Sequence, residues 1–189
     1  MFINLFLAVL WAKRKGYRLL PILKAYSLYP YVIAEVLYLY LQVCIFVGNY
    51  KYVQYTAIFR SVYLYTLLIP IFIYKIYKPG ICGSILIMIG TLLNKFVISQ
   101  NGGKMPVFAS LSKLTGYYKE SAIGVVDNIH SIGSETTRYK FLTDYIDLGN
   151  SILSIGDVLI HSFTFIVIYY VIKEINKGLK YATEDRKEY

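Results

Sequence analysis

The sequence predicts an all-α integral membrane protein, a helical bundle of about five transmembrane helices with a structured loop between the fourth helix and the fifth. Three observations favour this class. Of the 189 residues, 57% are hydrophobic and only 16% are charged, which is apolar for a soluble domain. The apolar residues gather in five stretches. Tyrosine is abundant, at 21 residues, and many tyrosines lie near the ends of these stretches, where amphipathic rings favour the headgroup region.

Five apolar stretches account for the predicted spans. The first is short against the roughly 20 residues that cross a bilayer, so an interfacial helix is the alternative to a span there. Tyr29-Pro30 and Pro79-Gly80 mark two of the helix starts, because proline suits the first turn of a helix. The spans are expected at residues 1–12, 28–48, 52–74, 79–98 and 151–172.

Residues 1–172 are expected to form a single transmembrane domain with an extracytoplasmic loop at 99–150, followed by a polar cytoplasmic tail at 173–189. Cytoplasmic segments of multi-pass proteins are enriched in lysine and arginine, whereas basic and acidic residues balance in this loop. The basic excess lies on the other side of a five-span arrangement, at Lys13, Arg14, Lys15, Arg18, Lys24, Lys75, Lys78, Lys173, Lys177, Lys180, Arg186 and Lys187. The pattern predicts a multi-pass protein of the cell membrane with its N-terminus outside and its C-terminus in the cytoplasm.

The basic residues behind the net charge of +9 are therefore interpreted as a signal of topology. They also add a mild attraction to anionic lipid. The expected partner is therefore the lipid bilayer. Nucleic acid is not expected, because the sequence lacks a basic patch interleaved with aromatic residues. Cys44 and Cys82 lie within apolar segments and form no CxxC or cysteine–histidine spacing, which favours two packed thiols over a metal site.

Polar residues recur along one face of the last predicted span. They follow one another at spacings of four, three, four and three residues, which places them on one side of a helix. A carboxylate that faces lipid is costly, so this stripe is expected to face protein or water. Its members are Asn150, Ser154, Asp157, His161 and Thr164.

A second stripe follows the fourth span and its extension. It consists of Gly83, Gly90, Asn94 and Asn101, which share one helical face. Small residues let helices approach closely in lipid, so packing is the favoured role of the two glycines.

Arg60 and Asp157 are the natural charge pair between the spans. At about 1.5 Å per residue from the outer boundary, Arg60 lies about 12 Å deep and Asp157 about 9 Å deep. Ionisable residues within spans usually pair and mark a functional site. The alternative is a buried ion pair that fixes helix packing without any chemistry.

The loop opens with a glycine turn at Asn101-Gly102-Gly103-Lys104, before Met105-Pro106. Two glycines followed by lysine and proline predict a tight, defined turn. Backbone N–H groups in such a turn can cradle an anion, with Lys104 as its counter-charge. The sequence lacks GxxxxGK[ST], so this turn is not a phosphate-binding P-loop. Helical spacing of the apolar residues in 107–118 predicts a short helix after the turn.

Several aspartates and both histidines fall in the loop and in the last span. His130 with Asp144, and His161 with Asp157, are candidate acid–base pairs for catalysis. Such residues could also bind a metal, as could Asp127, but no metal-ligand spacing fits and no metal site is predicted. Solvation and capping of the loop form the alternative. No cofactor follows from the sequence, and no nucleophile motif is present.

The segment Asn101-Gly-Gly-Lys-Met-Pro-Val107 resembles an uncharacterised bacterial membrane-protein family with an N-G-G-[KR]-M-P-V signature after a span. That family continues with a His, a Thr, an L-G-D segment and S-I-G-D at the start of the last span. The later matches here are His130, Thr136 or Thr137, Phe141-Leu142-Thr143-Asp144, and Ser154-Ile155-Gly156-Asp157. Thr143 departs from the family's usual glycine. The resemblance implies a membrane protein and emphasises Asn101, Lys104, His130, Asp144 and Asp157, but it implies no reaction.

The leading hypothesis is a polar site at the extracytoplasmic face that binds a small polar or lipid-linked ligand or a membrane-protein partner. The candidate ligand-binding residues are Arg60, Asn94, Asn101, Gly102, Gly103, Lys104 and Asp157. One alternative is a membrane-embedded hydrolase or transferase acting on a lipid or lipoprotein, for which the catalytic candidates are His130, Asp144, Asp157 and His161. The other is a proton-coupled carrier, for which Glu35 with His161 is the only hint and the absence of an inverted repeat counts against.

Overall fold

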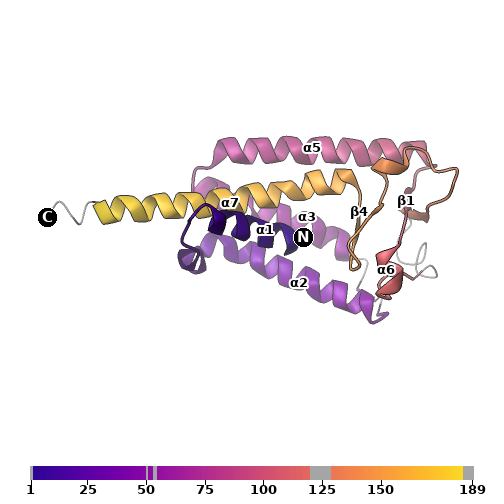
Figure 1. Cartoon of the computed structure of the whole chain (residues 1–189), viewed down its shortest axis with the longest axis horizontal. Helices are drawn as coiled ribbons and strands as arrows, with labels where there is room; N and C mark the ends of the chain where they lie inside the picture. Colours follow the sequence, from indigo (N-terminus) through magenta and orange to yellow (C-terminus); the bar gives the residue numbers. More distant parts are fainter. Residues whose placement is uncertain (1, 50, 53–54, 120–128, 185–189) are drawn as a thin grey trace. The chain divides into compact units, whose positions relative to one another are not determined.

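The computed structural model describes residues 2–49, 51–52, 55–119 and 129–184. The protein is mostly helical, as predicted (Figure 1). Three helices are long and apolar enough to cross a membrane, at Tyr26–Phe46, Tyr77–Gln100 and Ile155–Leu179. They correspond to the second, fourth and fifth predicted spans.

The first and third predicted spans form shorter helices. Helix α1 covers Phe2–Arg14. The third segment is divided into α3 (Thr56–Thr66) and α4 (Leu68–Ile73). The division has a cause in the sequence, because the ring of Pro70 would clash with the carbonyl four residues earlier, at Thr66, and α3 ends there.

The last helix runs further than the sequence suggested. Helix α7 covers Ile155–Glu184, so it continues through much of the expected tail. Lys177 and Glu174 form an ion pair of 2.6 Å on this extension, and side chains at this spacing support a helix. Figure 1 shows α7 as the long orange-to-yellow helix that closes the described chain.

The chain forms two compact units, of which the first contains Met1–Leu37, Phe59–Ser84 and His161–Tyr189. It includes α1, the 3-10 turns η1 (Leu20–Lys24) and η2 (Tyr26–Leu28), and the start of α2 (Tyr29–Phe46). Its core is built from Tyr31, Tyr63, Leu67, Phe163, Val167, Ile168, Val171 and Ile172. Gly83 in α5 (Tyr77–Gln100) lies against Phe163, since an added Cβ would stand 2.5 Å from that ring. The packing role predicted for this glycine is confirmed.

The second unit contains Tyr38–Ile58 and Ile85–Ile160. Between α5 and α7 it carries β1 (Met105–Val107), α6 (Leu111–Leu114), β2 (His130–Ile132), η5 (Lys140–Leu142), β3 (Ile146–Asp147) and β4 (Ile152–Leu153). β1 pairs with β2 in parallel, with Met105 opposite His130, and β3 pairs with β4 in antiparallel. The helix expected over 107–118 is therefore reduced to the single turn of α6, preceded by a strand.

The part of α5 in the second unit exposes a row of large apolar side chains. They are Ile85, Met88, Ile89, Leu92 and Phe96, each more than two-fifths exposed. Exposed apolar surface of this extent marks a contact with lipid or protein. On a helix of this length and polarity it suits the interior of a bilayer.

Candidate functional site

The glycine turn after α5 positions Asn101 at the base of the loop. Gly102 and Gly103 have φ values of +67° and +79°, a conformation that glycine adopts without the cost imposed by a side chain. The Asn101 side-chain amide donates to Val97 O at 2.9 Å and to Arg138 O at 3.1 Å, and its oxygen accepts the Arg138 N–H at 3.0 Å. One side chain thereby fixes the backbone of Arg138 to the end of α5.

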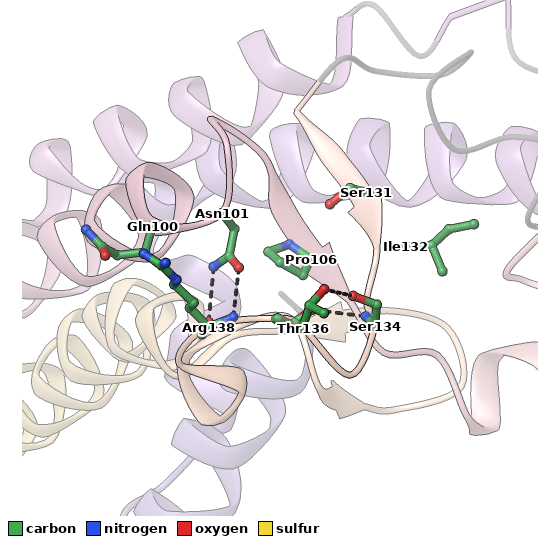
Figure 2. A pocket seen from close by; sticks show the side chains of 9 residues that line it. Gln100, Asn101, Pro106, Ser131, Ile132, Ser134, Thr136 and Arg138 are labelled. Atoms are coloured by element: carbon green, nitrogen blue, oxygen red, sulfur yellow. Dashed lines mark hydrogen bonds between the residues drawn. The ribbon is translucent and has the colours of Figure 1, made fainter.

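An open pocket of about 270 Å³ lies beside this clamp (Figure 2). Most of its lining groups are hydroxyls and amides, and one is a guanidinium. The lining residues are Gln100, Asn101, Pro106, Ser131, Ile132, Ser134, Thr136, Thr137 and Arg138. A lining that combines one arginine with hydroxyl and amide side chains suits an anionic group, in particular the oxygens of a phosphate or a carboxylate.

Local hydrogen bonds fix the far wall of the pocket. Ser134 N–H donates to Thr137 Oγ1 at 2.9 Å, and the hydroxyls of Ser134 and Thr136 lie 2.9 Å apart. Figure 2 shows these bonds across the pocket from the Asn101–Arg138 clamp. The wall is thus held by its own side chains before any ligand binds, which reduces the ordering that binding would require.

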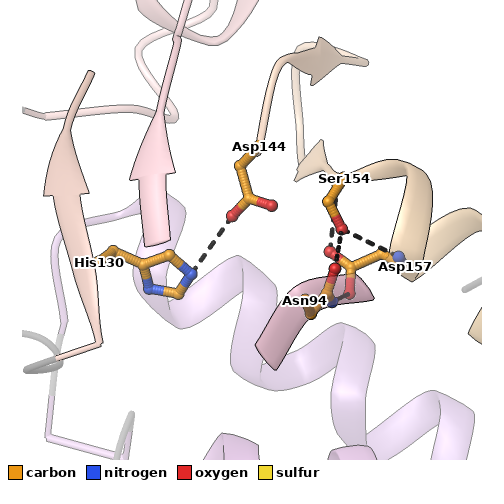
Figure 3. Close-up of polar contacts among 5 residues, drawn as sticks. All are labelled: Asn94, His130, Asp144, Ser154 and Asp157. Carbon is orange, nitrogen blue, oxygen red and sulfur yellow. Dashed lines mark hydrogen bonds and ion pairs between the residues drawn. The ribbon is translucent and has the colours of Figure 1, made fainter. Parts of the chain in front are cut away.

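His130 and Asp144 lie together, as the sequence analysis expected. His130 Nε2 stands 3.4 Å from Asp144 Oδ2, with the carboxylate buried and the imidazole half-buried (Figure 3). Strand pairing brings them together, because Asp144 forms a parallel bridge with Val107 and β2 starts at His130. A histidine beside a carboxylate has the parts of a general acid–base pair.

Asp157 belongs to a capping box at the start of α7. Asp157 N–H donates to Ser154 Oγ at 2.9 Å, and Ser154 N–H donates back to Asp157 Oδ2 at 3.3 Å. This reciprocal pattern satisfies two amides at a helix N-terminus. Asn94 completes it by donating to Asp157 Oδ1 at 3.0 Å and accepting from Ser154 Oγ at 2.8 Å (Figure 3). The structure therefore gives Asn94 and Asp157 a role in capping and packing.

Two glycines bring α5 and α7 close at the same point of the second unit. A Cβ added to Gly90 would stand 2.9 Å from Ile160 Cγ1 and would collide with Gly156 O. A Cβ added to Gly156 would stand 2.6 Å from Gly90 O. Small residues at helix contacts have this effect in membranes, and the packing role predicted for Gly90 is confirmed.

The other candidate residues from the sequence analysis are His161, Lys104, Arg60 and Asp127. In the first unit, His161 Nδ1 and the Tyr63 hydroxyl lie 2.8 Å apart. Lys104 is exposed and does not line the pocket. Arg60 lies in α3, but its side chain is outside the part of the chain that the structure describes, as is the whole of Asp127. Arg138 was not predicted, and the adjacent Thr136-Thr137 was the only signal in the sequence that pointed to its neighbourhood.

A second carboxylate network, around Asp147, was also not predicted. Its carboxylate accepts the N–H groups of Ser110 at 2.7 Å, Ser112 at 2.8 Å and Gly149 at 2.8 Å, and also the Ser112 hydroxyl. Burial would raise the pKa of Asp147, but the hydrogen bonds from Ser112, Gly149 and Ser110 outweigh it and lower the pKa to about 2. This carboxylate joins α6 to the β3–β4 hairpin.

Replacing Asp147 with alanine should destabilise the loop by about 1–2 kcal/mol at neutral pH, the range for losing a carboxylate cap. Because the folded pKa of about 2 lies below the ordinary value of 3.8, the stabilisation is present above pH 3.8 and is lost as the pH falls toward 2. Unfolding curves of the wild type and Asp147→Ala should therefore converge in that window. Glu135→Ala, which alters an exposed loop carboxylate, should leave stability unchanged at every pH.

The three long apolar helices suggest a membrane-associated protein of the helical class, with a polar loop between two of them. Residues 19–169 match the family of unknown function DUF5317, and the chain belongs to that family. The match is consistent with the expectation of an uncharacterised family. A relative named "Uncharacterized protein" from Thermotoga maritima is 32% identical over 110 residues, covering 56% of this chain and 60% of that protein. No solved structure matches the chain.

Proposed function

We propose that this protein is a multi-pass protein of the cell membrane that binds the anionic group of a small polar or lipid-linked ligand. The binding site is the pocket beside the Asn101–Arg138 clamp. The observation that carries the proposal is the pocket lining, in which Arg138 joins six residues with hydroxyl or amide side chains around a volume of about 270 Å³.

The position of the pocket along the chain favours a ligand at the membrane surface. Gln100, the last residue of α5, lines the pocket, and α5 is one of the helices able to cross a bilayer. The end of such a helix lies near the headgroups. A phosphate attached to a lipid headgroup would therefore lie at the same depth as Arg138. A soluble anion would reach the same pocket from outside the membrane.

Five spans with the N-terminus outside form part of the same proposal. In this arrangement α1 is the first span and α3 with α4 is the third. The distribution of lysine and arginine supports it, since the loop that carries the pocket has no net basic excess. The pocket then opens on the extracytoplasmic face, where the turn resembling N-G-G-[KR]-M-P-V supplies Asn101 and Pro106 to its lining.

Arg138→Ala tests the proposal by calorimetric titration of the full-length protein in non-ionic detergent. The probes are inorganic phosphate and a short-chain phosphatidylglycerol. Losing a charged hydrogen-bond donor costs about 1.5–3 kcal/mol, which weakens binding about 10- to 100-fold. Tighter binding of the lipid than of phosphate identifies a lipid-linked ligand.

Lys140→Ala is the matched control, because it removes an equal charge two positions away. The Lys140 ammonium lies 4.5 Å from the centre of the Phe108 ring, and Lys140 does not line the pocket. This variant should bind both probes like the wild type. Equal losses in the two variants would mean that a diffuse surface charge attracts the anion, and the proposed pocket would be wrong.

A further inference from the structure

A second set of polar side chains is buried in the first compact unit, and the proposed ligand pocket does not involve it. Helix α2 contributes Tyr31 and Glu35, α3 contributes Tyr63, and α7 contributes His161 and Thr164. Glu35 is only 3% exposed, and Tyr31 and Tyr63 are fully buried. Buried ionisable residues within apolar helices of this length are functional candidates by default.

Glu35 is buried without the partners that a buried carboxylate normally has. Within the described residues, neither oxygen of Glu35 has a hydrogen-bond partner, and the same holds for the hydroxyls of Tyr31 and Thr164. An uncompensated buried charge is strongly unfavourable, so such a group binds a proton and becomes neutral. The neutral acid then carries a proton that it can donate.

The same residues connect Glu35 to His161. Tyr31 and Glu35 are four residues apart on α2, so their side chains are neighbours. The rings of Tyr31 and Tyr63 lie 6.4 Å apart, centre to centre. The Tyr63 hydroxyl lies 2.8 Å from His161 Nδ1, and the two rings are stacked at 6.2 Å. Phenol hydroxyls both donate and accept, so they can pass a proton between an acid and an imidazole.

Apart from the N-terminal ammonium, which interacts electrostatically with Glu35, the other charged side chains of this unit that the structure describes are exposed or half-buried. Among its described side chains, Glu35 and His161 are the buried acidic and basic groups, and α3 also carries Arg60, whose side chain is outside the described part. Glu174 and Lys177 form their own ion pair on α7. Besides Lys177, the exposed basic residues among the described side chains of this unit are Lys13, Arg14, Lys15, Arg18, Lys24, Lys75 and Lys78, and Lys173 is half-buried. The described residues contain no group of three or more His, Cys, Asp or Glu side chains placed to hold a metal ion.

We propose that Glu35 is an exchangeable proton-binding site and that Tyr31, Tyr63 and His161 form its exchange route. The Tyr31 hydroxyl, which has no hydrogen-bond partner within the described residues, takes the proton of the Glu35 carboxylic acid and passes its own proton to the Tyr63 hydroxyl. The Tyr63 hydroxyl in turn passes its own proton to His161 Nδ1. Glu35 is then a carboxylate and His161 an imidazolium, so one proton has moved and the net charge is unchanged. Return of the proton restores both neutral groups.

Infrared spectroscopy of the full-length protein in detergent at neutral pH tests this site directly. The wild type should show the carbonyl stretch of a protonated carboxylic acid, which shifts in D₂O and is absent from Glu35→Gln. Glu174→Gln, which alters the surface ion pair, should retain the band. If Glu35→Gln fails to fold, Glu35→Asp replaces it, and the band should move to a different frequency.

Tyr63→Phe tests the route separately from the site, because it removes the hydroxyl and keeps the buried ring. The band of Glu35 should persist in this variant, and its hydrogen–deuterium exchange should slow at least tenfold. Two results would overturn the proposal. The first is a wild-type spectrum in which no protonated carboxyl band responds to changes at Glu35. The second is a rate of hydrogen–deuterium exchange that Tyr63→Phe leaves unchanged.

Discussion

Replacing Gly156 with alanine should destabilise the second unit by about 3 kcal/mol, at the upper end of the range for overpacking. The added Cβ would lie 2.6 Å from Asn94 Cγ and 2.6 Å from Gly90 O. The backbone carbonyl cannot move without displacing α5, and Asn94 cannot move without losing its hydrogen bonds to Ser154 and Asp157. Thermal or denaturant unfolding of the full-length protein in detergent measures the loss.

Gly178→Ala provides a control of the same chemistry on the same helix. Among the described residues, no atom outside the chain neighbours and the backbone of the helix itself lies within 4 Å of a Cβ added at Gly178, which is exposed in α7. Alanine favours a helix over glycine by about 1 kcal/mol, so this variant should be stabilised slightly. The two substitutions should thus change stability in opposite directions. A neutral or stabilising Gly156→Ala would contradict the close approach of α5 and α7 at this point.

Asp157→Ala should cost about 2–4 kcal/mol. Loss of a cap costs about 1 kcal/mol, and the Asn94 amide, left without its partner, adds about 1–3 kcal/mol. The loss should be accompanied by fraying of the first turn of α7, which hydrogen exchange at the amides of Ser154 and Asp157 would detect.

A double-mutant cycle with Ser154→Ala separates capping from other roles of Asp157. Because the two side chains bond to each other's backbone, their effects should be non-additive by about 0.5–3 kcal/mol. Independent effects would contradict the capping box. Anion binding should be unaffected in both variants, since neither residue lines the pocket.

The long helices were predictable because length and apolar content suffice to define them. The polar face of α7 was also predictable from spacing, and Ser154, Asp157, His161 and Thr164 are all buried. Their partners were not predictable in the same way. The pairing of Asp157 with Arg60 stays a prediction, because the Arg60 side chain is outside the described part. The sequence Ser-Ile-Gly-Asp before an apolar run is a capping-box pattern, and attention to it would have predicted the bond to Ser154.

The pocket could not be predicted from the sequence, for a different reason. Its walls meet through pairing of Met105 with His130 and through the Asn101 clamp on Arg138, which are contacts between residues far apart in the sequence. Strands of three residues have too few positions for a period of two to be visible. The glycine turn itself was predicted correctly, and the basic residue that lines the pocket is Arg138, whereas Lys104 does not line it.

Cysteine labelling in intact cells tests the central claim, an anion pocket open to the outside. The starting protein carries Cys44→Ser and Cys82→Ser, so that Ser134→Cys in the pocket wall supplies the reactive thiol. A membrane-impermeant maleimide should label it without permeabilisation, and added inorganic phosphate should slow the reaction in this protein but not after Arg138→Ala. Labelling that requires permeabilised cells, or that phosphate leaves unchanged, would contradict the account.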